Sequence, residues 1–364
     1  MTKYKKFTFL PKIAFVCAML SIFCGAHTIA VNAETPLTVY ADGRVYKLYS
    51  PELNISGGEY HINRLDDFIQ RVYLDTRVNP VDAEVVFKSD GGFYVKEDID
   101  GREIDVNSLK SQIIYALDSG KRKIEIRSHP VTADITAAYL RQETKLRAVF
   151  STAYTYSSEE RKNNIKLAAE SLNGAIIDLY SDFSFNETVG ERTTERGYKD
   201  AKIIIDGKFV TGTGGGVCQV STTLYNAAIR AGLIVKEYHR HSLAVSYVPP
   251  SFDAMVSGNA CDLKLKNRTG RRAYIGATAN GSVLTVFIYG AENEYTYEFR
   301  SEIDEIIPAT IKTVSKDSGE TEITPKNGIK SSAYVSVYKK GLLISSYKLR
   351  SDVYSPVNGV VFSG

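Results

Sequence analysis

Residues 212–226 read GTGGGVCQVSTTLYN and place four glycines within five positions, just before a single cysteine, Cys218. Apolar residues then recur at helical spacing from Val220 to Ala231, and Gly232 stands where a helix would end. The stretch predicts a glycine loop that leads into a helix, with Cys218 at or just before the first turn. Free backbone N–H groups and the helix dipole at that position favour a thiolate over a thiol.

The glycines suit chemistry at the sulfur. Without Cβ atoms, they would let a substrate carbonyl approach Cys218, and N–H groups around Gly216 to Gln219 would stabilise an oxyanion. Two other glycine motifs are excluded. A phosphate-binding loop ends in Gly-Lys-Ser/Thr, and the dinucleotide fingerprint needs a glycine where Val217 stands.

A thiol nucleophile also needs a base. His239 and His241 stand together in the run HRHSLAVSYVP at 239–249, which predicts a strand with both rings on one inward face. We prefer His241 as the base, and its orienting acid is Asp253, Asp262 or Glu237. Three other interpretations stay open. The two histidines are hydrogen-bonded core residues, or Cys218 and Cys261 form a disulfide, or the two histidines and the two cysteines together bind zinc. No CxxC spacing supports zinc, so we expect no metal and no cofactor.

The first 33 residues combine a lysine-rich start with the apolar block IAFVCAMLSIFCGAHTIA, which predicts a signal peptide or an uncleaved membrane anchor. Residues from about 34 onward are then exported, and they retain only two cysteines, the number expected when a thiol is kept for its chemistry. The 45 basic and 42 acidic residues leave a net charge of +3, too balanced to indicate a nucleic-acid partner.

The 364 residues predict two or three domains of mixed α+β class. We expect an α+β unit at 34–145, a central α+β unit at 146–290 and a small, separate β-sheet at 291–364. Expected helices span 105–120, capped by Asn107 or Ser108, and 157–174, with Ser157 and Glu160 at capping-box spacing. The expected strand regions are a hairpin at 83–99, single strands at 121–128, 202–210 and 282–290, and a strand pair around residues 339–341, whereas 183–201 reads as a loop.

Several ordered motifs resemble the VanW family of bacterial cell-surface proteins over residues 146–290. They are FSFNETVGERTTERGYKDA, GGGVCQVSTTLYNAA, HSLAVSYVP, DAMV and DLKLKN. The preceding region is similar to the peptidoglycan-binding domain often found upstream of VanW, and the last 70 or so residues resemble a G-five module. The chain departs from the family at Tyr238, where Arg is usual, and at Ser251 and Met255, where Gly and Thr are usual.

The resemblance implies work on the wall of a Gram-positive-type bacterium, with peptidoglycan stem peptides and glycan as partners. Some VanW-domain proteins are linked to L,D-transpeptidation, so Cys218 would be the nucleophile and His241 its acid and base, with His239 and Asp253 as further catalytic candidates. The alternatives are a non-catalytic wall-binding or resistance-accessory protein and a cysteine peptidase or amidase. Candidates for oxyanion or substrate binding are Gly215, Gly216, Gln219, Ser221, Thr222 and Arg192.

Overall fold

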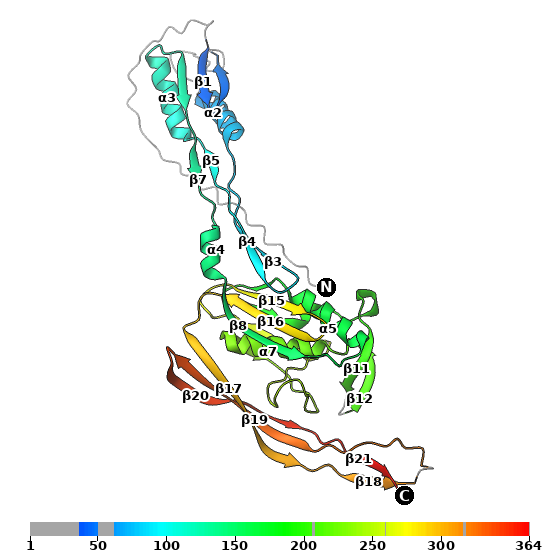
Figure 1. Ribbon diagram of the computed structural model, residues 1–364. Helices are drawn as coiled ribbons and strands as arrows, with labels where there is room; N and C mark the ends of the chain where they lie inside the picture. Colours follow the sequence, from blue (N-terminus) through cyan, green and yellow to red (C-terminus); the bar gives the residue numbers. More distant parts are fainter. Residues whose placement is uncertain (1–35, 50–61, 206–207, 259, 316–317, 364) are drawn as a thin grey trace. The chain divides into compact units, whose positions relative to one another are not determined.

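The computed structural model describes residues 36–49, 62–205, 208–258, 260–315 and 318–363, and the predicted leader lies outside them (Figure 1). Helices and strands are mixed throughout, which confirms the α+β class. The chain forms two compact units. One contains the described residues up to Asn79 together with Gly101–Val131, and the other contains Pro80–Asp100 and everything from Thr132 onward. Among the helices of the described residues, none is both long and apolar enough to cross a membrane.

The first unit folds two helices and a small sheet around one core. The sheet has the order β2 (Arg44–Leu48), β1 (Leu37–Ala41), β6 (Lys123–Ile126). The helices are α2 (Ile62–Thr76) and α3 (Val106–Asp118), and β5 (Gly101–Glu103) pairs with β7 (His129–Val131). The predicted helix at 105–120 is confirmed, but its cap is Asp105, whose carboxylate accepts the N–H groups of Asn107 and Ser108. This core is formed by apolar residues such as Leu37, Leu65 and Ile113.

The second unit is built around a four-stranded antiparallel sheet of order β8 (Lys145–Ala153), β16 (Val283–Gly290), β15 (Ala273–Ala279), β9 (Ala175–Ile177). Helices α5 (Glu159–Leu172) and α7 (Val217–Ala231) pack against this sheet and against each other. Leu284, Val286 and Ile288 alternate along β16 toward the same buried core. The hairpin β3 (Glu84–Phe87) and β4 (Phe93–Lys96), predicted from sequence, and α4 (Ala137–Glu143) precede the sheet in the chain.

Short elements surround this sheet, and here the sequence predictions need correction. The segment predicted as a loop holds β10 (Asp182–Ser184), α6 (Phe185–Val189) and the 3₁₀ turn η1 (Thr194–Arg196). The single strand predicted after it is a hairpin of β11 (Asp200–Ile205) and β12 (Lys208–Thr213). Strands β13 (Ile234–Glu237) and β14 (Lys264–Lys266) complete a small sheet with β10.

One predicted helix cap and one predicted strand are wrong in this unit. Ser158, not Ser157, caps α5, and the Ser157 hydroxyl accepts a hydrogen bond from Arg161 instead. Residues 239–249 form no strand. Their backbone groups bond to scattered partners: the N–H of His241 donates to the Asp253 side chain, and the carbonyl of Ser242 accepts from Ser355. The apolar residues that alternate along 239–249 therefore belong to a loop that packs on the core, and not to a strand.

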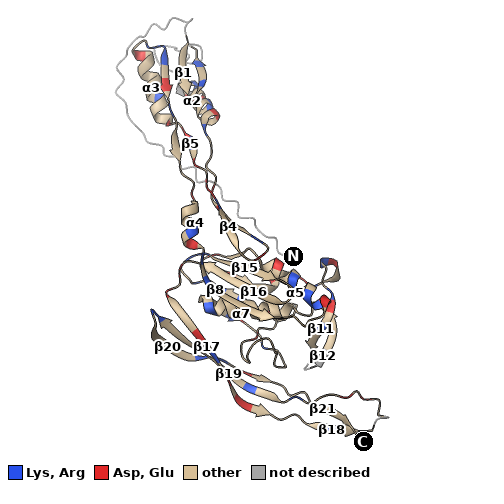
Figure 2. Ribbon diagram, viewed as in Figure 1, with Lys and Arg blue, Asp and Glu red and all other residues tan. Residues whose placement is uncertain are grey.

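The last segment is rich in strands, as predicted. Strands β17 (Tyr295–Ile307), β19 (Gly328–Lys339) and β20 (Leu342–Tyr354) form an antiparallel sheet, and β18 (Ile311–Val314) pairs in parallel with β21 (Gly359–Phe362). The predicted turn around Lys340 and Gly341 is confirmed, with positive φ at both residues. The sheet is not separate, however: Ala333 and Phe299 belong to the core of the α7 region. Lysine, arginine and acidic residues are interspersed along the ribbon of both units (Figure 2).

Candidate functional site

The glycine loop holds the start of α7 tightly against its neighbours. Gly214 and Gly216 have φ values of +87° and +111°, which side-chain-bearing residues rarely adopt. A Cβ on Gly215 would lie 2.7 Å from the carbonyl oxygen of Lys202 on β11, and one on Gly216 would lie 3.0 Å from Arg161 and Ile165 on α5. The glycines are thus required for close packing as well as for an open approach to the sulfur.

Cys218 is the second residue of α7 and is half-buried. Its Sγ lies 3.2 Å from the carbonyl oxygen of Val256. Burial by itself would raise the pKa of this thiol, but a hydrogen bond with His241, the charge of that ring, the Val256 contact and the charge of Arg192 hold its pKa below the usual value. Cys218 and Cys261 are both free, so the predicted disulfide alternative is wrong.

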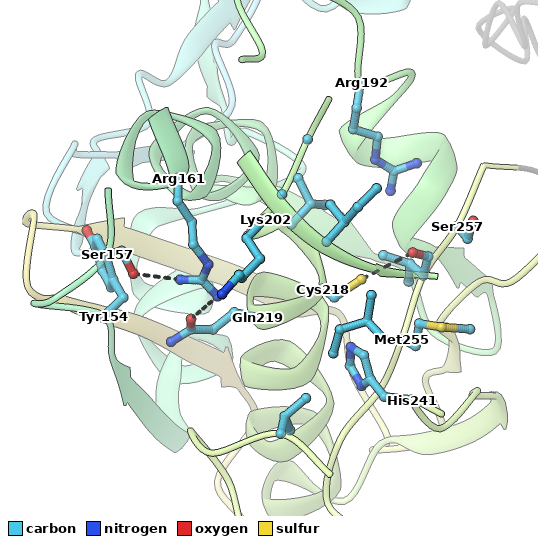
Figure 3. Close-up of a pocket in the computed structure, with 18 of the residues that line it drawn as sticks. Tyr154, Ser157, Arg161, Arg192, Lys202, Cys218, Gln219, His241, Met255 and Ser257 are labelled. Carbon is cyan, nitrogen blue, oxygen red and sulfur yellow. Dashed lines mark hydrogen bonds between the residues drawn. The ribbon is translucent and has the colours of Figure 1, made fainter. Parts of the chain in front are cut away.

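His241 is the histidine that the structure brings to the sulfur. Its ring is 4% exposed, and Nδ1 lies 2.7 Å from Oδ2 of Asp253. With Nδ1 paired to the carboxylate, Nε2 is the nitrogen available to Cys218 (Figure 3). Burial disfavours the charged ring, yet the hydrogen bonds with Asp253 and Cys218 outweigh it and raise the pKa of His241 to about 9. Both pKa shifts favour a thiolate that faces an imidazolium.

Asp253 is the partner acid of His241, a choice that the sequence left open. Its carboxylate is 1% exposed, and Oδ2 accepts both the ring Nδ1–H and the backbone N–H of His241, each at 2.7 Å. Burial would raise the pKa of Asp253, but the bonds with His241 and Tyr354 lower it below its usual value. The other two acids serve elsewhere: Asp262 accepts from Ser184 and Asn186 at the start of α6, and Glu237 bonds Lys264 and His239.

Segment 253–256 connects Cys218, His241 and Asp253: Asp253 bonds His241, and the carbonyl of Val256 contacts the sulfur of Cys218. Ser221 and Thr222, both fully buried, donate to the carbonyl oxygen of Ala254, and Thr222 accepts the Ala254 N–H. The N–H of Met255 donates to the carbonyl of His239 at 2.7 Å. Ser221 and Thr222 therefore hold the Asp253 segment against α7, and their burial does not fit the predicted contact with substrate.

Several other predicted residues lie differently from expectation. His239 bonds Glu237 at 3.0 Å and does not line the cleft that holds Cys218 and His241. The Gln219 side chain is 1% exposed and bonds Thr152, Ala153 and Arg161, so it is structural. Its backbone N–H already donates to Gly216, as that of Val217 does to Gly214. The N–H groups of Gly216 and Cys218 stay as candidates for an oxyanion hole.

Within the described residues, no group of three or more His, Cys, Asp or Glu side chains is placed to hold a metal ion. Cys218 and His241 open instead onto a cleft of about 1320 Å³. Arg192 lines the cleft, as do Arg161 and Lys202, which sequence reasoning missed because nothing local distinguishes a helix arginine or a strand lysine that faces a cleft (Figure 3).

Comparison with known protein families matches two parts of the chain. Residues 160–289 match the family model described as VanW like protein. The central part of the chain is thus similar to VanW like proteins. Residues 50–125 match a second family model, described as “Putative peptidoglycan binding domain”. The cysteine, its histidine and its aspartate all lie within the VanW match.

Two curated relatives match parts of this chain. "Uncharacterized protein YoaR" of Bacillus subtilis (strain 168) is 34% identical over 179 residues, which are 49% of this chain and 59% of that protein. "Vancomycin B-type resistance protein VanW" of Enterococcus faecalis (strain ATCC 700802 / V583) is 34% identical over 116 residues, 30% of this chain and 42% of that protein. The chain thus spans less than two thirds of both relatives.

One solved structure, "Crystal structure of HP0197-G5", aligns with 20% of this chain and with all of that chain, at 22% identity and a TM-score of 0.13. A score at this level supports no structural argument. The assignment of residues 291–364 to a G-five module, like the three domain boundaries, stays a prediction from the sequence.

Proposed function

We propose that this protein is an exported cysteine L,D-transpeptidase that cross-links peptidoglycan stem peptides. The observation that carries the proposal is the line of Cys218, His241 and Asp253, in which a sulfur at a helix start faces a ring held by a buried carboxylate. Nucleophile, base and orienting acid in this order form the arrangement of acyl-transfer enzymes that act through a covalent intermediate.

The first half of the reaction forms a thioester. The Cys218 thiolate attacks the carbonyl carbon between the third residue of a tetrapeptide stem and its terminal D-Ala, and the carbonyl electrons move onto oxygen. The N–H groups of Gly216 and Cys218 would stabilise that oxyanion. When the carbonyl re-forms, the C–N bond breaks, and the His241 imidazolium gives its proton to the departing D-Ala amine.

The second half transfers the acyl group. The side-chain amine of another stem's third residue attacks the thioester carbonyl, and neutral His241 takes the proton that this amine loses. Cys218 leaves as the thiolate, which restores the starting state with one new amide bond. Asp253 keeps the ring in one orientation through both halves.

Cations of the cleft suit a donor that carries carboxylates. Arg192 bonds the amide oxygen of Asn186, and Arg161 bonds Ser157 and Gln219, so neutral groups hold both guanidiniums in place. Burial lowers the pKa of both arginines, which means that each charge is held where water screens it poorly. A substrate carboxylate beside either guanidinium would stabilise its charge. We assign Arg192 to bind the terminal carboxylate of the leaving D-Ala.

The cellular setting is part of the same proposal. The match of residues 50–125 to a peptidoglycan-binding family and the glycopeptide-resistance title of the E. faecalis relative both indicate work on the cell wall. An N-terminal leader would bring the chain there, either by release or by anchoring in the membrane. The partners would be stem peptides and glycan.

Incubation of purified residues 34–364 with disaccharide-tetrapeptides tests the activity. We expect D-Ala release and muropeptide dimers with the unaltered chain and neither with Cys218→Ala. D-Ala release without dimers would instead identify a hydrolase with the same residues. Equal product from both chains, or no product from either, would contradict the proposal and leave the non-catalytic wall protein. Ser257→Ala, a change at the rim of the same cleft, is the matched control.

A further inference from the structure

The end of strand β20 reaches the partner acid of the site. Tyr354 donates its hydroxyl to Oδ1 of Asp253 at 2.5 Å, and the Tyr354 hydroxyl oxygen accepts the Ser251 N–H at 2.8 Å. Arg350 donates to the backbone carbonyl of Asp253 at 2.8 Å and approaches Oδ1 at 3.4 Å. These contacts join residues about 100 positions apart in the chain.

The two oxygens of Asp253 have separate partners. Oδ2 faces His241, whereas Oδ1 faces Tyr354 and Arg350. A carboxylate held at both oxygens cannot rotate about its Cβ–Cγ bond, so the direction of the acceptor that meets the imidazole is set from the C-terminal sheet. Arg350 is itself held by Asp352 at 2.7 Å and lies 4.1 Å from the ring centre of Tyr238.

Burial along β20 shows that this end of the strand is built for the contact. From Leu342 to Lys348 the strand is exposed, and then every second residue is buried: Arg350, Asp352 and Tyr354. All three carry polar groups, and Arg350 and Tyr354 are 5% and 1% exposed. Burying a charge is costly unless it is paired, so simple attachment of a sheet would favour apolar residues at these positions.

The C-terminal sheet and the residue that follows it also bond the loop segments beside Asp253. The Ser355 N–H donates to the carbonyl of Ser242, directly after His241, and Ser301 on β17 donates to the carbonyl of Pro250. Ser251, with a φ of +63°, bonds Ser331 on β19 at 2.7 Å. A glycine would adopt that backbone conformation without strain, whereas the serine adds a contact with the sheet.

We propose that Tyr354 and Arg350 are positioning residues for the reaction centre, so that the C-terminal sheet is a working part of the site and sets the reactivity of Cys218 through Asp253 and His241. This inference deepens the proposed transpeptidase, and thiol reactivity can test it without any peptidoglycan substrate. The charged or titratable groups around Asp253 are His241, Arg350, Tyr354, the buried Tyr247 and, through Arg350, Asp352.

The test compares Tyr354→Phe with Ser331→Ala in the full chain. Tyr354→Phe removes one hydroxyl next to Asp253, and Ser331→Ala removes one buried hydroxyl of the same interface, which bonds the Ser251 hydroxyl. Alkylation of Cys218 by iodoacetamide is followed from pH 5 to 10 on the peptide that carries it, by mass spectrometry, so that other cysteines do not contribute. Thermal unfolding of each variant is measured in parallel.

We expect Tyr354→Phe to raise the midpoint of the alkylation profile by about one pH unit and to slow alkylation at pH 6 about tenfold, the size expected when a hydrogen bond to a charged group is lost. Ser331→Ala should lower the melting temperature and leave the midpoint unchanged. The proposal is overturned if Tyr354→Phe keeps the wild-type midpoint. Should Tyr354→Phe fail to fold, Arg350→Lys, which keeps the charge but loses the fork, must raise the midpoint, and an unchanged midpoint there overturns the proposal equally.

The outcome also separates this inference from the proposed function. If the unaltered chain makes no muropeptide dimers but Tyr354→Phe still shifts the midpoint, the positioning role stands and the transpeptidase assignment is lost. If the unaltered chain forms dimers but Tyr354→Phe keeps the wild-type alkylation midpoint, the transpeptidase assignment stands. The C-terminal sheet is then packed against the site without setting the reactivity of Cys218.

Discussion

Replacing Asp253 by asparagine tests the triad most directly, because the two side chains have the same shape. Tyr354 and Arg350 donate toward Oδ1, so the amide oxygen of asparagine would take that position. Its NH₂ group would then face His241, whose backbone N–H and Nδ1–H now point at Oδ2. Two donors would meet, and the ring would be forced to carry its proton on Nε2, where it cannot accept one from Cys218.

The magnitude follows from the pKa of His241. Its rise from 6.5 to about 9 corresponds to about 3 kcal/mol in favour of the imidazolium, and the ring is buried enough that solvent screens little of it. Hydrogen bonding to Asp253 is the largest contribution that raises this pKa, and a hydrogen bond to a charged group contributes about 1.5–3 kcal/mol. Asp253→Asn should therefore lower the thiolate population at pH 7 by about 10- to 100-fold.

Alkylation of Cys218 by iodoacetamide as a function of pH measures this population. The variant should show a midpoint near or above that of a free thiol and a rate at pH 7 that is lower by the same factor. Asp262→Asn is the matched control, since Asp262 is another buried aspartate but bonds Ser184 and Asn186 instead of histidine. An Asp253→Asn variant that folds and alkylates at the wild-type rate would refute the reasoning.

Four further outcomes are expected. Acyl transfer should decline above about pH 9, where His241 loses the proton that it donates, while alkylation of the thiolate stays high; a parallel decline of both would contradict the assigned acid. Arg192→Met should raise KM for a tetrapeptide donor about tenfold, because one hydrogen bond to a charged group is lost. KM for a donor with an amidated terminus should stay unchanged. His239→Ala should change the transfer rate by less than about twofold, since its ring does not line the cleft. Gly215→Ala should lower the free energy of unfolding by about 1–3 kcal/mol because its Cβ would meet backbone, whereas Gly92→Ala, facing only the Asp90 side chain, should be nearly neutral in a denaturant titration.

Local signals predicted much of the fold. Helix α7 followed from apolar spacing between two glycine-marked ends, and α3, the β3–β4 hairpin and the strand pair β19–β20 followed from periodicity and turn residues. These elements are stabilised by neighbours in sequence, so their residues carry the information. The strand predicted at 239–249 was wrong because alternation there reflects a loop packed on a core, with its backbone bonded to the Asp253 side chain and to Ser355, just after β20.

For the site, the sequence by itself predicted the candidate nucleophile and determined its helix, because four glycines before a lone cysteine are a local pattern. It also narrowed the base to two histidines and the acid to three residues. Only the tertiary structure decided between them, bringing Asp253 to His241 and Tyr354 and Arg350 to Asp253 across about 100 residues. Contacts of this kind depend on how segments distant in sequence pack together. Such packing produces no local pattern in the sequence from which it could be predicted.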